Sequence, residues 1–267
     1  MKRALLIGIN YKGTPYELYG CVNDINLISQ ALIQKYRYNP FNIMMLSDNG
    51  RKPTRANIEQ GIRWLLQGTK AGDSLFFYYS GHGAYMRDAS KDESDGRDEL
   101  IIPLDVEKAG VITDDWLFTN MVEKVPRGAS LWAFGDCCHS GTLCDLRYNM
   151  TCIPTPVTNK DQYSGYLSSE WKDTFTMSYE KSKDIRGSVC FFSGALDSQQ
   201  AMDSFFGTSA QGAFTVALLI ALQNGVSKKV KDLLKEVNCW LKLMGYGSQN
   251  CQLSAGSLVD LEKSITI

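Results

Sequence analysis

Short apolar runs alternate with amphipathic segments along most of this chain, and that alternation restricts its fold more than any other feature. The apolar runs are residues 3–9, 42–46, 74–80, 100–103, 130–136 and 188–194. Segments with helical spacing of apolar residues are 22–36, 54–66, 113–125, 213–223 and 230–243. Continuous apolar runs are typical of strands that are buried on both faces of a parallel sheet. The alternation therefore predicts an α/β fold, with a mostly parallel central sheet and helices on both faces.

Size and charge narrow the class of protein. A chain of 267 residues can bury roughly three-quarters of its unfolded surface. Its net charge of −1 provides no basic field for nucleic acid or an anionic membrane, so neither is expected as a partner. The apolar runs are shorter than a membrane span, and residues 4–9 are too short for a signal peptide. Eight cysteines without a CxxC pair predict reduced thiols, so we expect a cytoplasmic protein.

Two polar segments follow strands whose carboxyl ends should meet at one edge of the sheet. Ser80-Gly81-His82-Gly83 ends the run at 74–80, and Asp136-Cys137-Cys138-His139 ends the run at 130–136. Ligands of such sheets bind at this edge. A cysteine nucleophile needs a base and oxyanion donors, which His82 and the backbone around its flanking glycines can supply. The spacing of 56 residues between His82 and Cys138 is close to that of caspases. By this reasoning either cysteine can be the nucleophile.

Other readings of these residues remain open at this point. His82 is alternatively a structural histidine at a strand end. His139 is interpreted as structural, because the side chain of an immediate neighbour of Cys138 is expected to point elsewhere. Zinc is disfavoured, because Cys137, Cys138 and His139 are contiguous and cannot easily surround one tetrahedral ion. A redox switch of Cys137 with Cys138 requires a strained disulfide.

The combined motifs resemble those of metacaspases, cysteine peptidases with the caspase fold. The resemblance rests on SGHG at 80–83 and DCCHSG at 136–141, with GCVND at 20–24, DGRDELIIPLD at 95–105 and ITDD at 112–115. It extends over most of the chain, and the modest length of the 142–187 segment is similar to the type I form. The resemblance implies a caspase-like three-layer sandwich. It also implies one domain over 1–267, with a large-subunit-like part at 1–141, a loop-rich linker at 142–187 and a small-subunit-like part at 188–267.

The resemblance assigns roles to individual residues. It implies that Cys138 is the nucleophile and His82 the general base, with backbone N–H groups of Gly83 and Cys138 as oxyanion donors. It places the pocket for the residue before the scissile bond at Asp24, Asp136, Ser80 and Cys21. Two carboxylates in this pocket favour Arg or Lys and disfavour Asp. The alternative for Asp24 is a helix cap, a role that Asn23 can fill equally well.

Metacaspases also suggest a calcium site. The implied ligands are Asp98, Asp114, Asp115 and Asp145, from separate segments, whereas an EF-hand is excluded because Lys91 and Ile102 would occupy its ligand positions. Asp145 lies just beyond the cysteine motif, so Ca²⁺ is expected to activate by ordering the loop that carries Cys138. Asp114 can instead cap the helix that begins there.

These observations predict a calcium-dependent cysteine endopeptidase that acts on proteins or peptides with basic residues, as a monomer. Self-cleavage in the 142–187 segment is expected at Lys181, Lys183 or Arg186. The chain starts almost directly at its first strand, so we expect that a gating pro-segment is absent or has been removed. The alternative function is a non-enzymatic caspase-like scaffold in stress signalling, with little or no peptidase activity.

Overall fold

The structure, a computed structural model, describes residues 1–87, 97–137, 143–156, 171–179, 185–195, 203–206, 209–223 and 228–267. Among these residues, one central sheet contains eight strands in the order β2-β1-β3-β7-β10-β13-β8-β9. Five of them run parallel: β2 (Ile43–Ser47), β1 (Lys2–Gly8), β3 (Ser74–Ser80), β7 (Ser130–Asp136) and β10 (Ser188–Ser193). The rest are antiparallel: β13 (Gln252–Ala255), β8 (Tyr148–Pro156) and β9 (Trp171–Tyr179). The predicted α/β class and mostly parallel sheet are confirmed.

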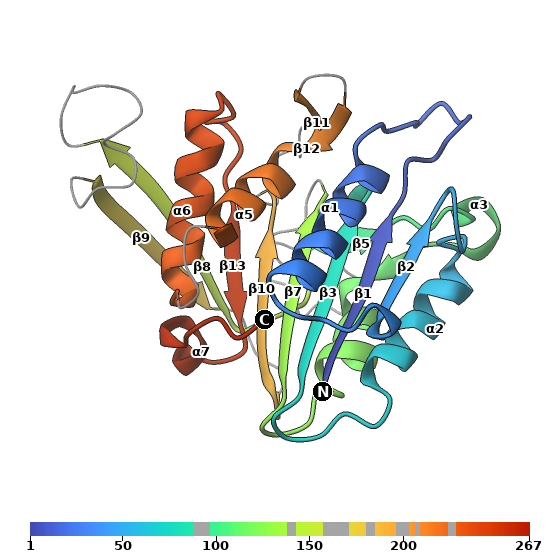
Figure 1. Ribbon diagram of the computed structural model, residues 1–267, viewed down its shortest axis with the longest axis horizontal. Coiled ribbons are helices and arrows are strands. Elements are labelled where there is room, and N and C mark those ends of the chain that lie inside the picture. The colour runs from blue at the N-terminus through green and yellow to red at the C-terminus, as the bar shows by residue number, and fades with distance from the viewer. Residues whose placement is uncertain are drawn as a thin grey trace.

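Helices cover both faces of this sheet. On one face lie α1 (Cys21–Gln34), α5 (Ala213–Gln223) and α6 (Val230–Leu243), which stand in front of the strands in Figure 1. On the other lie α2 (Arg55–Leu66), α4 (Asp114–Leu117) and the π-helical turn η2 (Phe118–Val122). The shorter helices are η1 (Pro40–Asn42), α3 (Val106–Ala109) and α7 (Leu258–Glu262). The result is a three-layer arrangement.

The apolar runs are buried on both faces because their side chains alternate between two helical layers. In β3, Phe76 and Tyr78 pack in the layer of α1 and α5, whereas Phe77 and Tyr79 pack in the layer of α2. The strand β7 follows the same alternation. Since successive strand residues point to opposite faces, a run buried on both sides must be apolar at every position.

Two small sheets lie outside the central one. The first contains β4 (Gly83–Arg87), β5 (Arg97–Ile101) and β6 (Ile112–Thr113), and the second is the hairpin of β11 (Asp203–Phe206) and β12 (Ser209–Gly212). Figure 1 places the hairpin above the carboxyl ends of the parallel strands, close to α1 and α5. Both small sheets thus lie near the carboxyl ends of the parallel strands, where the candidate residues are predicted.

Three local predictions need correction. The 142–187 segment is not only loop, because β8 and β9 lie in it and complete the sheet. The helix expected over 113–125 is divided between α4 and η2. The helix expected from Val22 begins at Cys21 with Gly20 as its N-cap and without a side-chain cap, so Asp24 does not cap it. The predicted cap of α2 is confirmed, since Thr54 accepts from the Asn57 N–H.

Candidate active site

The candidate residues meet at the carboxyl edge of the parallel strands. Ser80 ends β3 and pairs in register with Asp136, which ends β7. His82 follows two residues after Ser80, and Asp24 comes to the same edge from the first turn of α1. Sequence segments more than 100 residues apart in the chain thus converge where the strand order predicts a ligand site.

Asp24 and Asp136 form a buried acid pair. Asp24 has 0% and Asp136 5% of its surface exposed. Ser80 Oγ donates to Asp24 Oδ2 at 2.9 Å, and the Gly212 N–H donates to Asp24 Oδ1 at 2.9 Å. Asp136 Oδ2 accepts from Thr215 twice, from the backbone N–H at 3.1 Å and from Oγ1 at 2.7 Å. Fixed donors therefore hold both carboxylates in place.

The two carboxylates converge on Gly212, the last residue of β12. A Cβ added there would lie 2.0 Å from Asp136 Oδ2 and 3.0 Å from Asp24 Oδ2. Only glycine leaves room for both oxygens. Sequence reasoning identified Asp24, Asp136 and Ser80 but missed Gly212 and Thr215. The sequence around these two residues does not indicate a role in a site, because a glycine before a helix and a threonine in the first turn of a helix are common.

Cys21, the fourth predicted pocket residue, is buried at the start of α1, one helical turn before Asp24. Its carbonyl group lies against Gly8 of β1, where an added Cβ would be 2.4 Å from the oxygen. The backbone of α1 at Cys21 therefore lies close against β1.

The His82 imidazole is held by the loop that follows β1. Its Nε2 lies 2.7 Å from the Tyr16 carbonyl oxygen. Because a carbonyl oxygen only accepts, Nε2 carries the proton of the neutral ring and Nδ1 is the acceptor nitrogen. The ring also packs against Tyr11, with centroids 4.8 Å apart. This arrangement suits a general base, in which one nitrogen is anchored and the other receives a proton.

Two tyrosines fix the backbone around His82. The His82 N–H donates to the Tyr11 hydroxyl at 3.1 Å, and the Tyr79 hydroxyl donates to the His82 carbonyl at 2.7 Å. A Cβ on Gly81 would lie 2.7 Å from the Tyr79 hydroxyl. Gly81 is therefore required by close packing. Gly83, the expected oxyanion donor, begins β4 immediately after the histidine.

The predicted nucleophile, Cys138, lies outside the described residues, as does His139. Cys137 is described, and it is buried in the apolar layer on the α2 side of the sheet. The other described cysteines are also buried, and none of the described cysteines forms a disulfide. Burial raises the pKa of Cys144, Cys190 and Cys251 well above the ordinary thiol value, so these thiols are unreactive.

The predicted calcium ligands lie on and beside the small sheet. Asp98 in β5 and Asp114 at the start of α4 are buried. Asp114 accepts from the Glu99 and Asp115 N–H groups at 2.7 Å each, and Thr113, not Asp114, caps α4. Burial, with the nearby carboxylates of Asp145 and Asp98 acting in the same direction, raises the pKa of Asp114 to about 7. These carboxylates thus repel one another.

Carboxylates from separate segments are the donors that Ca²⁺ prefers, so the chemistry of this cluster suits that ion. However, within the ranges that the structure describes, no three His, Cys, Asp or Glu side chains are already arranged around a common point for a metal.

Of the predicted self-cleavage residues, Lys181 and Lys183 lie outside the described residues, whereas Arg186 is exposed just before β10. None of the described helices has the length and apolar character needed to cross a membrane.

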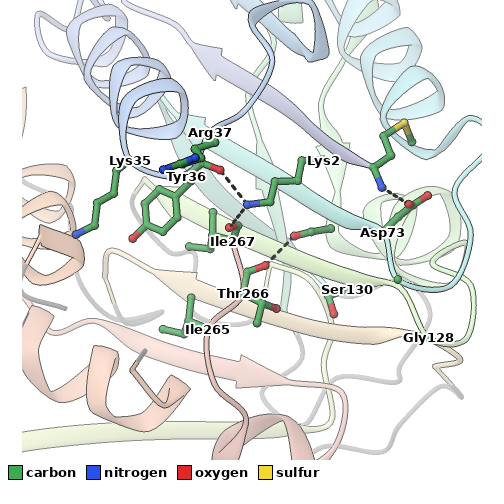
Figure 2. Close-up of a pocket in the computed structure, with 13 residues that line it drawn as sticks. Lys2, Lys35, Tyr36, Arg37, Asp73, Gly128, Ser130, Ile265, Thr266 and Ile267 are labelled. Atoms are coloured by element: carbon green, nitrogen blue, oxygen red, sulfur yellow. Dashed lines mark hydrogen bonds and ion pairs between the residues drawn. The ribbon is translucent and has the colours of Figure 1, made fainter. Parts of the chain in front are cut away.

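A cavity of about 850 Å³ lies at the opposite edge of the sheet, and none of the candidate residues lines it. Figure 2 shows Lys2 reaching two carbonyl oxygens there, those of Tyr36 at 2.9 Å and Ile267 at 2.8 Å. Lys2 is thus already hydrogen-bonded within the protein.

A family profile described as "Metacaspase, peptidase C14 domain" matches residues 2–147, more than half of the chain. The chain belongs to the metacaspase family. The segment matched contains the His82 and Cys138 motifs as well as Asp24 and Asp136.

Similar proteins agree with this assignment. Metacaspase-1 of Cryptococcus neoformans is 38% identical over 97% of this chain, which spans 63% of that protein's length. Metacaspase-1 of Pyricularia oryzae is 33% identical over 98% of this chain and 73% of its own. Among solved structures, pro-sf-caspase-1 superposes with a TM-score of 0.56 at 13% identity, covering 99% of this metacaspase and 89% of that chain. The fold is therefore caspase-like.

Proposed function

We propose that this metacaspase is a cysteine endopeptidase that cleaves peptide bonds after Arg or Lys. The observation that carries the proposal is the acid pair, Asp24 and Asp136, at the sheet edge that also bears His82. Two carboxylates attract a guanidinium or ammonium group and repel an aspartyl side chain. Membership in a peptidase family supports cysteine peptidase chemistry.

The proposed reaction is acyl transfer through a thioester. Cys138 Sγ gives its proton to His82 Nδ1 and attacks the carbonyl carbon, while the N–H groups of Gly83 and Cys138 stabilise the oxyanion. The carbon–nitrogen bond then breaks as the imidazolium returns the proton to the leaving amine. Water, deprotonated by His82, attacks the thioester and restores the thiol. The Tyr16 carbonyl, 2.7 Å from Nε2, orients the ring and stabilises its charged form.

The environment of Cys137 supports Cys138 as the nucleophile. Cys137 has only 1% of its surface exposed and packs among apolar side chains on the face opposite the acid pair. A thiol in such surroundings is inert. His82 would therefore have to act on the next cysteine.

The burial of the acid pair implies that substrate binding includes a movement. Gly212 of β12 donates to Asp24 and lies against Asp136, so the strand covers both carboxylates. A basic side chain reaches them only when β12 moves aside. We therefore infer that the β11–β12 hairpin opens as the substrate binds.

Calcium is proposed as an activator bound by Asp98, Asp114, Asp115 and Asp145. The raised pKa of Asp114 reflects burial and like charges, and a divalent cation would offset both. The ion supplies no step of the peptide hydrolysis. Because Asp145 lies seven residues after Cys138, calcium binding there would order the loop that carries Cys138.

Self-cleavage near Lys181, Lys183 or Arg186 follows from the proposed specificity, and exposure of Arg186 supports access to the last of these bonds. Mass spectrometry of the incubated protein would identify the cut, and a Cys138→Ala variant should remain intact. We further propose a cytoplasmic location, since the described cysteines are buried and form no disulfide, and a monomeric state. Size-exclusion chromatography with light scattering would check the monomer.

The experiment that tests this function is hydrolysis of matched arginyl, lysyl and aspartyl peptides, each with chelator and with millimolar calcium. We expect turnover of the arginyl and lysyl peptides only, and only with calcium. Faster turnover of the aspartyl peptide would reverse the specificity, and equal rates in chelator would eliminate the role of calcium.

Two variants and an inhibitor serve as controls. Cys138→Ala should abolish turnover, while Cys137→Ala should retain it; the opposite pattern would exchange the two cysteines. An arginyl reactive-carbonyl inhibitor should label Cys138 stoichiometrically. Failure of both labelling and turnover would favour a non-enzymatic caspase-like scaffold instead.

A further inference from the structure

A cavity of about 840 Å³ adjoins His82 on the side away from the acid pair. It lies between the loop that contains Tyr11 and Tyr16 and the segment 102–108, with His82 and Gly83 in its wall. Asp24, Ser80 and Asp136 are not among the described residues that line it. Its volume is within the range of roughly 300–1,000 Å³ that is typical of ligand pockets. The cavity can therefore hold side chains of a peptide.

The segment 102–108 gives this cavity an apolar wall. Ile102, Leu104 and Val106 occupy alternate positions and are each half-buried, so they retain surface that a ligand can cover. Pro15 and Tyr16 are exposed on the opposing loop. The charged lining residues are Asp105, Glu107 and Lys108, with Glu107 and Lys108 exposed. Aliphatic and aromatic surface thus faces a space that opens beside the imidazole.

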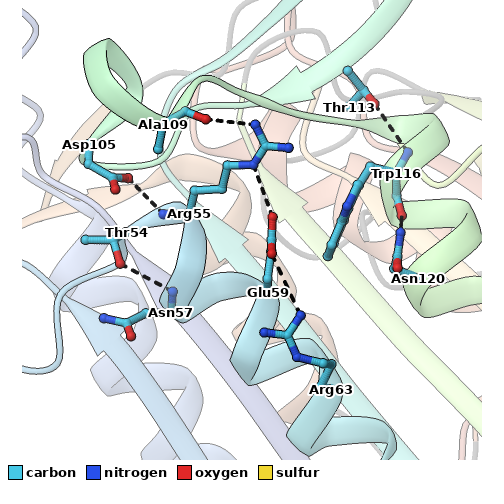
Figure 3. Close-up of polar contacts among 10 residues, drawn as sticks. All are labelled: Thr54, Arg55, Asn57, Glu59, Arg63, Asp105, Ala109, Thr113, Trp116 and Asn120. Carbon is cyan, nitrogen blue, oxygen red and sulfur yellow. Dashed lines mark hydrogen bonds and ion pairs between the residues drawn. The ribbon is translucent and has the colours of Figure 1, made fainter.

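This wall is fastened to α2 and is formed before any substrate arrives. Figure 3 shows Arg55 joining the two parts: its N–H donates to Asp105 Oδ1 at 2.8 Å, and its Nη1 donates to the Ala109 carbonyl at 2.8 Å. The Leu104 N–H also donates to the Pro53 carbonyl at 3.0 Å. Since Asp105 is engaged at the start of α2, the apolar side chains set the preference of the cavity.

The acid pair and the cavity lie on opposite sides of the catalytic edge. Ser80 and Asp136 point to the α1 and α5 side, where they contact Asp24 and Thr215. The His82 ring instead packs on Tyr11, whose hydroxyl donates to the Ile102 carbonyl at 2.6 Å on the α2 side. A peptide whose basic side chain occupies the acid pair must therefore cross His82 to reach the cavity.

The proposed reaction indicates which half of the substrate lies on the cavity side of His82. In the function proposed above, on which this inference rests, the acyl half stays on the sulfur and the amine half accepts its proton from His82. The leaving half therefore lies beside the imidazole. An extended chain advances about 3.3 Å per residue, so the first two residues after the scissile bond lie within reach of the cavity.

We propose that this cavity is the subsite for the leaving half of the substrate, and that it binds an apolar side chain from the first or second residue after the scissile bond. Ile102, Leu104 and Val106 determine its preference, while the acid pair selects the residue before the bond. Cleavage is then governed by two separate features of the substrate: a basic residue on one side and an apolar residue on the other.

The test uses internally quenched peptides with a fixed Arg before the bond and Leu, Phe, Ala or Asp in each of the next two positions. We expect Leu or Phe in one position to raise kcat/KM by about tenfold over Asp, the scale of burying one apolar side chain. Leu104→Ser and Val106→Ser should each reduce this preference severalfold. Leu258→Ser, the same change at an exposed site on α7, should leave it intact.

A peptide aldehyde that ends in arginine separates this subsite from the acid pair, because it has no leaving half. Its inhibition constant should be unchanged in Leu104→Ser and Val106→Ser. A flat response to the leaving-side residue in the wild type, or an unchanged preference in both folded variants, would overturn the inference. Loss of arginine selectivity with the leaving-side preference retained would instead refute only the proposed specificity for Arg and Lys.

Discussion

At the scale of single residues, the proposed specificity depends on how the two carboxylates of the acid pair are held. Asp136 Oδ2 receives both donors of Thr215, a buried residue in the first turn of α5. The Thr215 hydroxyl is shared with the Tyr78 hydroxyl, which lies in hydrogen-bond contact with it. Thr215 thus positions a carboxylate that would bind substrate, without touching the substrate itself.

Replacing Thr215 with Val should weaken cleavage after Arg through KM. The variant keeps the side-chain shape but removes the hydroxyl donor to Asp136. A hydrogen bond to a charged group contributes about 1.5–3 kcal/mol, which corresponds to about 10- to 100-fold in kcat/KM. Steady-state kinetics on an arginyl peptide would measure this, and Thr215→Ser should restore most of the activity.

Tyr78→Phe is the matched control for Thr215→Val, because it removes only the contact between the two hydroxyls. Its KM should stay close to the wild-type value. Equal effects of the two changes would mean that the contact between the Tyr78 and Thr215 hydroxyls, and not the donor to Asp136, controls binding.

At the scale of elements, β12 packs closely against Asp24 and Asp136, the two carboxylates of the proposed substrate pocket. Its last residue, Gly212, leaves no space for a methyl group between two carboxylates. A strand that covers the acid pair also controls access to it.

Gly212→Ala should therefore abolish cleavage after Arg and Lys while the protein stays folded. The added methyl would displace Asp136, and the pair would no longer converge. Gly247→Ala offers a control, because the atom nearest its added Cβ is 3.6 Å away on a flexible lysine. Peptide hydrolysis would be compared with far-UV circular dichroism. Unchanged turnover in Gly212→Ala would show that the acid pair does not bind the substrate.

Asp114, at the start of α4 beside the small β4–β5–β6 sheet, is a second buried carboxylate with like charges nearby. Its pKa is raised from 3.8 to about 7, so between these values the folded protein keeps a proton that the unfolded chain has released. Stability should then be greatest below pH 4 for this group and fall as the pH rises to 7, by up to about 4 kcal/mol. Urea unfolding in chelator across this range would measure the slope.

The same experiment with Asp145→Asn gives a comparison. Asn tolerates the left-handed backbone at this position, where φ is 51°, and it removes one of the like charges. The fall in stability should become smaller. An identical slope in the two proteins would mean that Asp145 does not contribute to the raised pKa of Asp114.

At the scale of the whole molecule, the sequence predicts the parallel half of the sheet better than the antiparallel half. The parallel strands are continuous apolar runs, and Thr54 marks the start of α2 as expected. In contrast, Pro154 and Pro156 favour a loop in the sequence, because proline lacks the N–H that a strand interior needs. Both nevertheless lie in β8, which pairs with the edge strand β9. The acid pair and His82 follow from motifs, whereas Thr215 and Gly212 meet Asp136 only through the tertiary fold.

The whole fold also determines how many thiols can react. Each of the seven described cysteines is buried, and the eighth is Cys138. Brief treatment of the native protein with iodoacetamide should add one group per chain, detected by intact mass, and none in Cys138→Ala. Denatured protein should add eight. Several adducts on the native chain would indicate that the described core opens readily.

The hydrogen bond between His82 Nε2 and the Tyr16 carbonyl oxygen affects how the sequences of related proteins can be compared. The partner of the imidazole is a main-chain atom, and the tyrosine side chain that shares its residue is 71% exposed. Any amino acid at position 16 supplies the same oxygen. The amino acid at position 16 can therefore differ among related proteins while the contact to His82 persists, so this contact is recognised only in the three-dimensional structure.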